Sequence, residues 1–220
     1  LRHYQAGRYV KAQEIALSMA HKFPEHATSH SNLGTAFRAI GKLKEAEASY
    51  RLALAISPDS CEFQNNLGII LKDLGDLSGA EAHLRRAIEL KTDYSEAHNN
   101  LGITLKELGN LGSAEKSLRR AIELKPDNSD AYNNLGNTLK ELGSLKEAEA
   151  SFRRAIELAP FSATAHFNLG IFFHDIKKYH QALLHFNSCN TKKSTRFTLK
   201  CLYNLDMKEP FFKLLDKLIS

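Results

Sequence analysis

The side chains in this sequence whose type and spacing best suit binding chemistry are asparagines. An Asn-Leu-Gly triplet recurs five times, and each copy begins 34 residues after the one before it. A side-chain amide donates to a carbonyl oxygen and accepts from an N–H group, so one asparagine can bond both groups of a peptide backbone. A row of such amides predicts that an extended chain is held without its sequence being read. The five asparagines are Asn32, Asn66, Asn100, Asn134 and Asn168.

The same amides have a second interpretation, in which they satisfy polar groups between neighbouring helices. Each net hydrogen bond contributes about 0.5 to 1.5 kcal/mol. Several amides must therefore act together before a ligand is held usefully. Both interpretations stay open on the sequence alone, with contact to a peptide the favoured one.

A row of bases has the same 34-residue spacing. Each unit is numbered here from position 1 to position 34, and the first unit starts at Ala27; a base then occupies position 12 in four units. Spaced positive charge favours an acidic or carboxylate-bearing ligand. However, an acid follows at position 13 in four units and can pair with bases on the next unit, so a self-neutralised stripe is the favoured interpretation. The position-12 bases are Arg38, Lys72, Lys106 and Lys140.

No arrangement typical of an enzyme is evident. The segment from Gly34 to Lys42 resembles a phosphate-binding loop, but six residues instead of four lie between its glycines, and no Ser or Thr follows the lysine. His26 and His30 have the spacing of metal ligands on a helix, yet no HExxH or paired-cysteine pattern accompanies them. We therefore expect a non-catalytic chain without a metal or other cofactor.

Composition bounds the compartment and the partners. Three cysteines lack the close pairing of a disulfide framework, which favours a reducing cytoplasm. No apolar run approaches the length of a membrane-spanning helix. Residues 176–220 hold nine bases but only three acids, which accounts for the excess of bases in the whole chain. The rest of the chain, with most of the repeats, is therefore close to neutral. Nucleic-acid readers need basic side chains unit by unit, so we expect no nucleic acid, although an RNA-binding helical repeat is the rival class.

Two helices in each unit are expected to position these side chains. Small or apolar residues recur at positions 3, 7, 10, 11 and 14 and again after the turn, a spacing that lines one helical face. Glycine at position 8 and alanine at position 20 let the paired helices approach closely, and larger residues at position 24 fill the space between units. The tight turn needs the permissive backbone of glycine at position 15. These glycines are Gly41, Gly75, Gly109 and Gly143.

This pattern resembles the tetratricopeptide repeat family, which has Leu-Gly at positions 7 and 8, Ala at 20 and 27, and Pro at 32. The resemblance implies an all-α, right-handed superhelical solenoid of antiparallel helix pairs. It also implies that the first helices line a concave groove that binds an extended peptide or a partner helix. The asparagine row looks like the asparagine ladder of O-linked N-acetylglucosamine transferases.

Two further sets of groove residues follow from this resemblance, which points positions 2, 5, 6, 9, 12 and 13 towards the groove. Isoleucines at position 9, Ile69 and Ile103 among them, give the groove an apolar floor for aliphatic side chains of a partner. The clamp with which family members hold the terminal carboxylate of heat-shock chaperones is absent, because no base occupies position 5 or 6. Position 5 carries Asn65, Asn99 and Asn133.

The repeat register predicts the segments of the chain and the ends of its helices. In the fifth unit Lys177 replaces the turn glycine and Cys189 replaces alanine. Asn190 and Lys192 stand at two positions that are apolar in the other four units, so the second helix of the fifth unit is expected to end early. Ser194 is predicted to cap a helix that runs to about Leu205, and Pro210 suits the first turn of another that ends near Ile219. The predicted segments are a truncated second half-repeat (1–26), four repeats (27–60, 61–94, 95–128 and 129–162), a degenerate repeat (163–196) and capping helices (197–220).

The terminal segments carry apolar residues outside the complete repeats. Apolar residues at Phe211, Leu214, Leu215 and Leu218 fit a cap over the end of the stack; the alternative is an amphipathic membrane helix with Lys213 and Lys217 on its polar side. Residues 1–26 lack a first helix, so an apolar edge is uncovered and self-association through it is expected.

The sequence thus predicts a non-catalytic protein-interaction scaffold. The alternative is the substrate-recruiting arm of a larger enzyme such as a glycosyltransferase.

Overall fold

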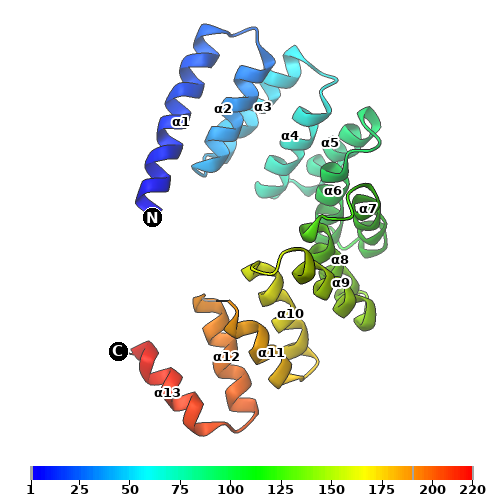
Figure 1. Ribbon diagram of the computed structural model, residues 1–220. Coiled ribbons are helices and arrows are strands. Elements are labelled where there is room, and N and C mark those ends of the chain that lie inside the picture. Colours follow the sequence, from blue (N-terminus) through cyan, green and yellow to red (C-terminus); the bar gives the residue numbers. More distant parts are fainter. Residues whose placement is uncertain (1, 190, 220) are drawn as a thin grey trace. The chain divides into compact units, whose positions relative to one another are not determined.

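The computed structural model describes residues 2–189 and 191–219, and every regular element in this part of the chain is a helix (Figure 1). Leu1, Asn190 and Ser220 belong to the predicted segments 1–26, 163–196 and 197–220 but lie outside the described residues. The helices are α1 (Arg2–Lys22), α2 (Ala27–Ala39), α3 (Leu43–Ile56), α4 (Cys61–Asp73), α5 (Leu77–Leu90), α6 (Ser95–Glu107), α7 (Leu111–Leu124), α8 (Ser129–Glu141), α9 (Leu145–Leu158), α10 (Ala163–Asp175), α11 (Tyr179–Asn187), α12 (Lys192–Asn204) and α13 (Lys208–Ile219).

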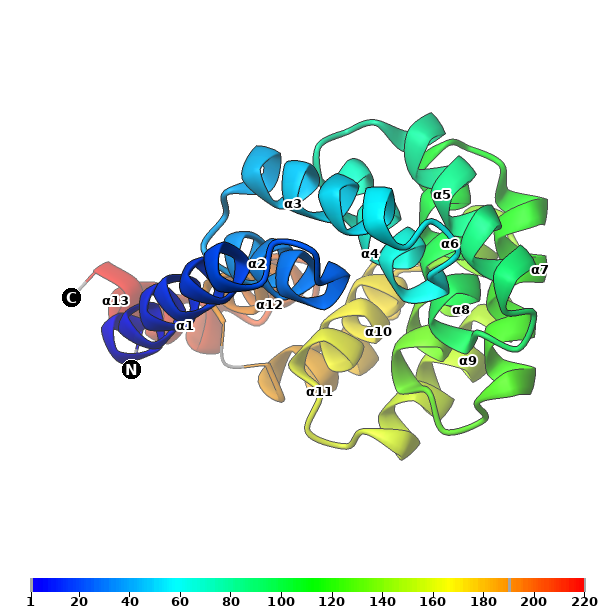
Figure 2. The same ribbon diagram turned by 90° about the horizontal axis from the view of Figure 1, so that it is seen from above.

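The chain forms two compact units, Leu1–Leu124 and Lys125–Ser220, which are described separately. In the first unit α1 precedes three helix pairs, α2 with α3, α4 with α5 and α6 with α7; α3 also packs on α4, and α5 on α6 (Figure 2). In the second unit α8 pairs with α9 and α10 with α11, and α12 and α13 follow. The predicted all-α repeat of helix pairs is confirmed.

Close approach within a pair depends on the glycine at position 8. In α4, a Cβ added to Gly68 would lie 2.7 Å from the Cγ atom of Leu84 at position 24. Leu84 also packs with Leu101 and Leu105 of the next repeat. The residue at position 24 therefore fills the space between repeats, as predicted, and in addition occupies the place that a side chain at position 8 would need.

The turns between paired helices use the left-handed backbone region. All four position-15 glycines have positive φ, between 79° and 89°. In the fifth repeat Lys177 takes the same conformation, with φ of 61°. This region costs an L-residue other than glycine about 1 to 2 kcal/mol. The degenerate repeat thus keeps the geometry of the turn although it has lost the residue that favours it.

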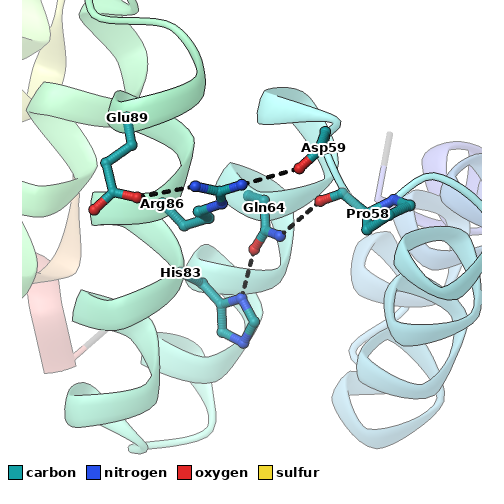
Figure 3. A network of polar contacts seen from close by, with 6 residues as sticks. All are labelled: Pro58, Asp59, Gln64, His83, Arg86 and Glu89. Carbon is teal, nitrogen blue, oxygen red and sulfur yellow. Dashed lines mark hydrogen bonds and ion pairs between the residues drawn. The ribbon is translucent and has the colours of Figure 1, made fainter.

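A hydrogen bond from position 4 ties each of several repeats to the one before it. Gln64 at this position donates its amide to the carbonyl oxygen of Pro58 over 3.1 Å, and its own oxygen accepts from Nδ1 of His83 over 2.7 Å (Figure 3). Arg86 completes the network through ion pairs with Asp59 and Glu89. His30, His98 and His166 likewise contact the carbonyl oxygens of Pro24, Thr92 and Pro160.

The end of the second unit departs from the repeat. As expected, α11 is short, with 9 residues against 14 in α9. The start of α12 differs from the prediction. Thr191 is the N-cap residue and Ser194 is its partner three residues later, with each side chain accepting from the backbone N–H of the other. The capping box uses both residues, whereas the sequence analysis had placed the cap at Ser194.

A cluster of aromatic rings fastens α12 to α10 and α11. The ring of Phe197 lies 5.8 Å from Phe167, 5.5 Å from Phe186 and 5.4 Å from His174, measured between ring centroids. Cys201, four residues after Phe197 in α12, is fully buried. In α13 Phe211, Leu214 and Leu215 are half-buried. These observations agree with a capping role for residues near the end of the chain; the side chain of Leu218 lies outside those described.

Candidate peptide-binding surface

The position-6 asparagines are linked to the position-5 asparagines of the preceding repeat. Asn100 donates its amide to Oδ1 of Asn65 over 2.9 Å, and Asn168 donates to Oδ1 of Asn133 over 3.0 Å. These bonds join neighbouring first helices of the same unit, α4 to α6 and α8 to α10. In Asn100 and Asn168, one N–H group of the amide therefore bonds a polar group of the neighbouring helix, as the second interpretation expected.

An amide has two N–H groups and a carbonyl oxygen, so one such bond leaves further capacity for a ligand. Asn100 and Asn168 are half-buried, as are Asn66 and Asn134, whereas Asn32 is exposed. The bond to the preceding repeat also fixes the rotation of the amide. A side chain held in this way loses less conformational entropy when it binds a peptide.

The position-5 asparagines are less accessible than the groove geometry of the resemblance implies. Asn65 is 2% exposed and Asn133 is 8% exposed, whereas Asn99 is half-buried. Burial between first helices leaves Asn65 and Asn133 little surface for a ligand. Each instead accepts a hydrogen bond from the amide of the next repeat, Asn65 from Asn100 and Asn133 from Asn168.

The isoleucines at position 9 lie on the same helices. Ile69 in α4 and Ile103 in α6 are half-buried, and Ile171 in α10 is too. In the first repeat the corresponding residue is Thr35, which is exposed and shares a 2.8 Å hydrogen bond with the hydroxyl of Tyr50. Position 9 is therefore apolar in the second and third repeats of the first unit, whereas in the second unit it is Asn137 in the fourth repeat and Ile171 in the fifth.

The position-12 bases take part in ion pairs between repeats. Arg38 contacts Asp73 at 3.2 Å, and Lys140 contacts Asp175 at 2.9 Å. Each acid therefore pairs with the base of the preceding repeat, whereas the sequence analysis had assigned it to the next repeat. Lys72 contacts its own neighbour, Asp73, at 2.8 Å. These pairs support the self-neutralised interpretation for the residues that form them, and Lys106 is half-buried.

The histidines have structural partners. His30 contacts the Pro24 carbonyl oxygen, and His26 stacks on Phe23 with 5.3 Å between ring centroids. Among the side chains that the structure describes, no three His, Cys, Asp or Glu residues gather as metal ligands would.

One histidine pair was not anticipated. The Nδ1 atoms of His166 and His185 lie 3.2 Å apart, and Nε2 of His166 donates to the Pro160 carbonyl oxygen. In a neutral His166 this leaves Nδ1 as the acceptor, so His185 donates. Burial, with smaller contributions from His166 and Arg153, lowers the pKa of His185 to about 4. A signal existed in the sequence: histidine at position 4 faces histidine at position 23 only in the fifth repeat.

Two of the three cysteines are buried thiols with little reactivity. Cys189 and Cys201 are buried, and burial raises the pKa of both, to about 11 for Cys201. A thiol with a raised pKa carries little thiolate at neutral pH and is a poor nucleophile.

Profiles of known families match most of the chain. Two profiles described as "Tetratricopeptide repeat" match residues 99–163 and 133–188, and residues 59–127, and one described as "TPR repeat" matches residues 34–75. The chain belongs to the tetratricopeptide repeat family. No curated protein matches it.

Several solved structures share the tetratricopeptide repeat fold of this chain. PilF of Pseudomonas aeruginosa is 18% identical, with a TM-score of 0.75 over 87% of this chain and 90% of its own. One chain of the Cut9–Hcn1 hetero-tetramer is 17% identical to this chain, with a TM-score of 0.80 over 90% of this chain and 40% of the matched chain. YrrB, described as a TPR protein with an unusual peptide-binding site, is 21% identical, with a TM-score of 0.61 over 90% of this chain and all of its own. At these identities the likeness concerns the fold alone.

None of the described helices is both long and apolar enough to cross a membrane.

Proposed function

We propose that this tetratricopeptide repeat chain is a non-catalytic scaffold that binds an extended segment of another protein along its first helices. The observation that carries the proposal is the pair of bonds from Asn100 to Asn65 and from Asn168 to Asn133. They hold half-buried amides in fixed orientations on α6 of the first unit and on α10 of the second, each beside a half-buried isoleucine of the same helix. Such a surface suits a peptide backbone flanked by aliphatic side chains.

The proposal applies equally if the chain recruits substrates for a larger enzyme such as a glycosyltransferase, because the peptide-binding step is the same. Its setting is the cytoplasm, which agrees with three cysteines in the thiol form. The peptide-binding site described for YrrB belongs to that protein, and it is a precedent for peptide binding on this fold.

The test begins with peptides selected by the wild-type chain from a displayed library of random sequences. Binding of the selected peptides is then measured by fluorescence anisotropy for the wild type and for a variant carrying Asn66→Ala, Asn100→Ala and Asn134→Ala. Loss of several bonds worth about 0.5 to 1.5 kcal/mol each predicts a dissociation constant at least about tenfold higher. Methylating backbone nitrogens of the peptide should weaken binding as well.

A matched control carries Arg85→Ala and Arg120→Ala. Both arginines are exposed on second helices and pair with Glu81 and Glu123 of their own helix. This control should bind as the wild type does, provided that circular dichroism shows equal helicity. Equal affinity of the asparagine variant and the control would exclude the asparagine row as the peptide site.

The exposed face of α1 supports self-association as a second proposal. Val10, Ile15 and Met19 are 49%, 55% and 40% exposed. Met19 occupies position 27 of the repeat register, where Ala53 is fully buried against its own first helix. Sedimentation velocity at increasing concentration should show dimers that Ile15→Glu with Met19→Glu abolishes. A monomer at all concentrations would contradict this proposal without touching the peptide site.

A further inference from the structure

One face of α12 combines cations with apolar side chains. Arg196, Leu199, Lys200 and Tyr203 follow the i, i+3, i+4, i+7 spacing of one helical stripe. The opposite side of α12 is held by the aromatic cluster at Phe197 and by buried Cys201 and Leu202. The stripe is therefore turned away from the interior, and three of its members are exposed while Leu199 is half-buried.

This stripe borders an open hollow of about 510 Å3 that also includes His174 of α10 and Phe211 of α13. A second hollow of about 500 Å3 lies on the other side of Tyr203 and Phe211 and contains Met207 and Phe212. Tyr203 is 75% exposed and Phe212 is 56% exposed. Hollows of this size lie within the range of about 300 to 1,000 Å3 that holds ligands.

The charges around the first hollow are of one sign. In the described part of the chain no carboxylate lies within ion-pair distance of Arg196 or Lys200, and no acid lines this hollow. Lys200 instead lies over the ring of Phe197, 5.1 Å from its centroid. The acid of the second hollow, Asp206, is 3.9 Å from Lys208. This contrasts with the position-12 bases Arg38 and Lys140, which have acidic partners.

We infer that the α12–α13 hollow is a second docking site, and that it takes an acidic peptide segment with one aromatic or aliphatic anchor residue. The anchor enters the hollow between Leu199, Tyr203 and Phe211, and acidic residues on either side of it pair with Arg196 and Lys200. A concave apolar floor fits an inserted side chain better than it fits a flat lipid surface, which favours a peptide over a membrane. The site extends the proposed function to a separate surface and does not require the asparagine row.

The test uses a short labelled peptide in which a single phenylalanine is flanked on both sides by acidic residues. Wild-type protein should bind it in a salt-dependent manner, measured by anisotropy. Replacing the phenylalanine by serine, or the acids by lysines, should weaken binding at least about tenfold. Among protein variants, Arg196→Glu with Lys200→Glu should weaken binding at least about tenfold, and Tyr203→Ser about fivefold.

Two controls match these variants in chemistry. Lys44→Glu with Lys116→Glu makes the same change in net charge at exposed sites elsewhere, and Phe161→Ser removes an aromatic side chain that is 100% exposed. Both controls should bind like the wild type. The Asn66→Ala, Asn100→Ala and Asn134→Ala variant should also retain this binding, which separates failure of the present inference from failure of the asparagine site.

Three outcomes would overturn the inference: no binding of the acidic peptide, equal losses in the charge variant and its control, or unchanged affinity after Tyr203→Ser. Vesicles of phosphatidylserine and phosphatidylcholine are tested in parallel. Sedimentation of the wild type with these vesicles, without binding of the peptide, would assign the hollow to a membrane surface and contradict the peptide assignment.

Discussion

Asn100 donates its side-chain amide to Oδ1 of Asn65 in the preceding repeat, over 2.9 Å. The two residues differ in their exposure to a ligand. Asn65 is 2% exposed and acts as a fixed acceptor, whereas Asn100 keeps part of its surface for a ligand. Stability of the repeat stack and orientation of the binding amide therefore depend on the same bond.

The variant Asn65→Ala should lower the free energy of unfolding by about 1 to 3 kcal/mol, because it removes a buried side chain and leaves the Asn100 amide without its acceptor. Urea unfolding followed by circular dichroism measures this change. The matched control is Asn32→Ala, at an exposed position, where a change within about 0.5 kcal/mol is expected. Equal effects of the two substitutions would show that the bond between repeats contributes no stability.

Two glycines of the third repeat should respond oppositely to alanine. A Cβ at Gly102 would lie 2.5 Å from Cγ of Leu118, whereas a Cβ at Gly112 would meet nothing within 4 Å. Overpacking predicts that Gly102→Ala lowers the free energy of unfolding by about 1 to 3 kcal/mol. Gly112→Ala should raise it by about 0.5 to 1 kcal/mol, because alanine favours helix over glycine. Thermal and urea unfolding of both variants test the contrast, and destabilisation by Gly112→Ala would contradict it.

The fold could be predicted well from the sequence because backbone conformation and the space available to a side chain restrict the residue type at several positions of the repeat. Glycine at position 15 reflects a positive φ, and glycine at position 8 reflects a close approach of Leu84 or Leu118. Both requirements limit residue type strongly, so they recur every 34 residues and can be recognised. The early end of α11 was predicted from departures towards the end of the fifth repeat, Cys189 and Lys192 among them.

The candidate site was predicted less completely, because polar side chains reveal their type but not their partners. Nothing in the sequence distinguishes the buried Asn65 from the half-buried Asn99 at the same position of the repeat, and the asparagine at position 5 was assigned to the ligand instead of to the next helix. No role was predicted for position 4, although Gln64 and His166 at this position donate to carbonyl oxygens of the preceding repeat. The hollow beside α12 lies where the register ends, so no repeat pattern pointed to it.

Lys177 offers a test of backbone strain. Its φ of 61° is one that glycine adopts freely, so Lys177→Gly should raise the free energy of unfolding by about 0.5 to 1 kcal/mol after the greater unfolded-state entropy of glycine is subtracted. Lys177→Ala keeps the Cβ atom and should give no such gain. Urea unfolding of the two variants isolates the conformational effect. A gain from alanine equal to that from glycine would attribute the effect to loss of the lysine charge.

The pair His166 and His185 predicts that stability depends on pH. Burial, followed by His166 and Arg153, lowers the pKa of His185 from 6.5 to about 4 in the folded chain. Between these values the unfolded chain binds a proton that the folded chain does not, so the free energy of unfolding rises with pH. This stability is complete above about pH 6.5 and is lost as the pH falls towards about 4. Because His185 is only half-buried, we expect a loss of about 1 to 2 kcal/mol, less than the full pKa difference implies.

Urea unfolding of the wild type and of His185→Gln, across this pH range, measures the dependence. The glutamine variant should show a shallower fall, since its side chain does not titrate and its amide can still donate to Nδ1 of His166. His180→Gln removes an exposed histidine from the same helix and should leave the slope of the wild type unchanged. His83, whose pKa is lowered mainly by burial, contributes a fall in the same direction that persists in both variants. If the free energy of unfolding of His185→Gln depends on pH as steeply as that of the wild type, the acid sensitivity lies in residues other than His185.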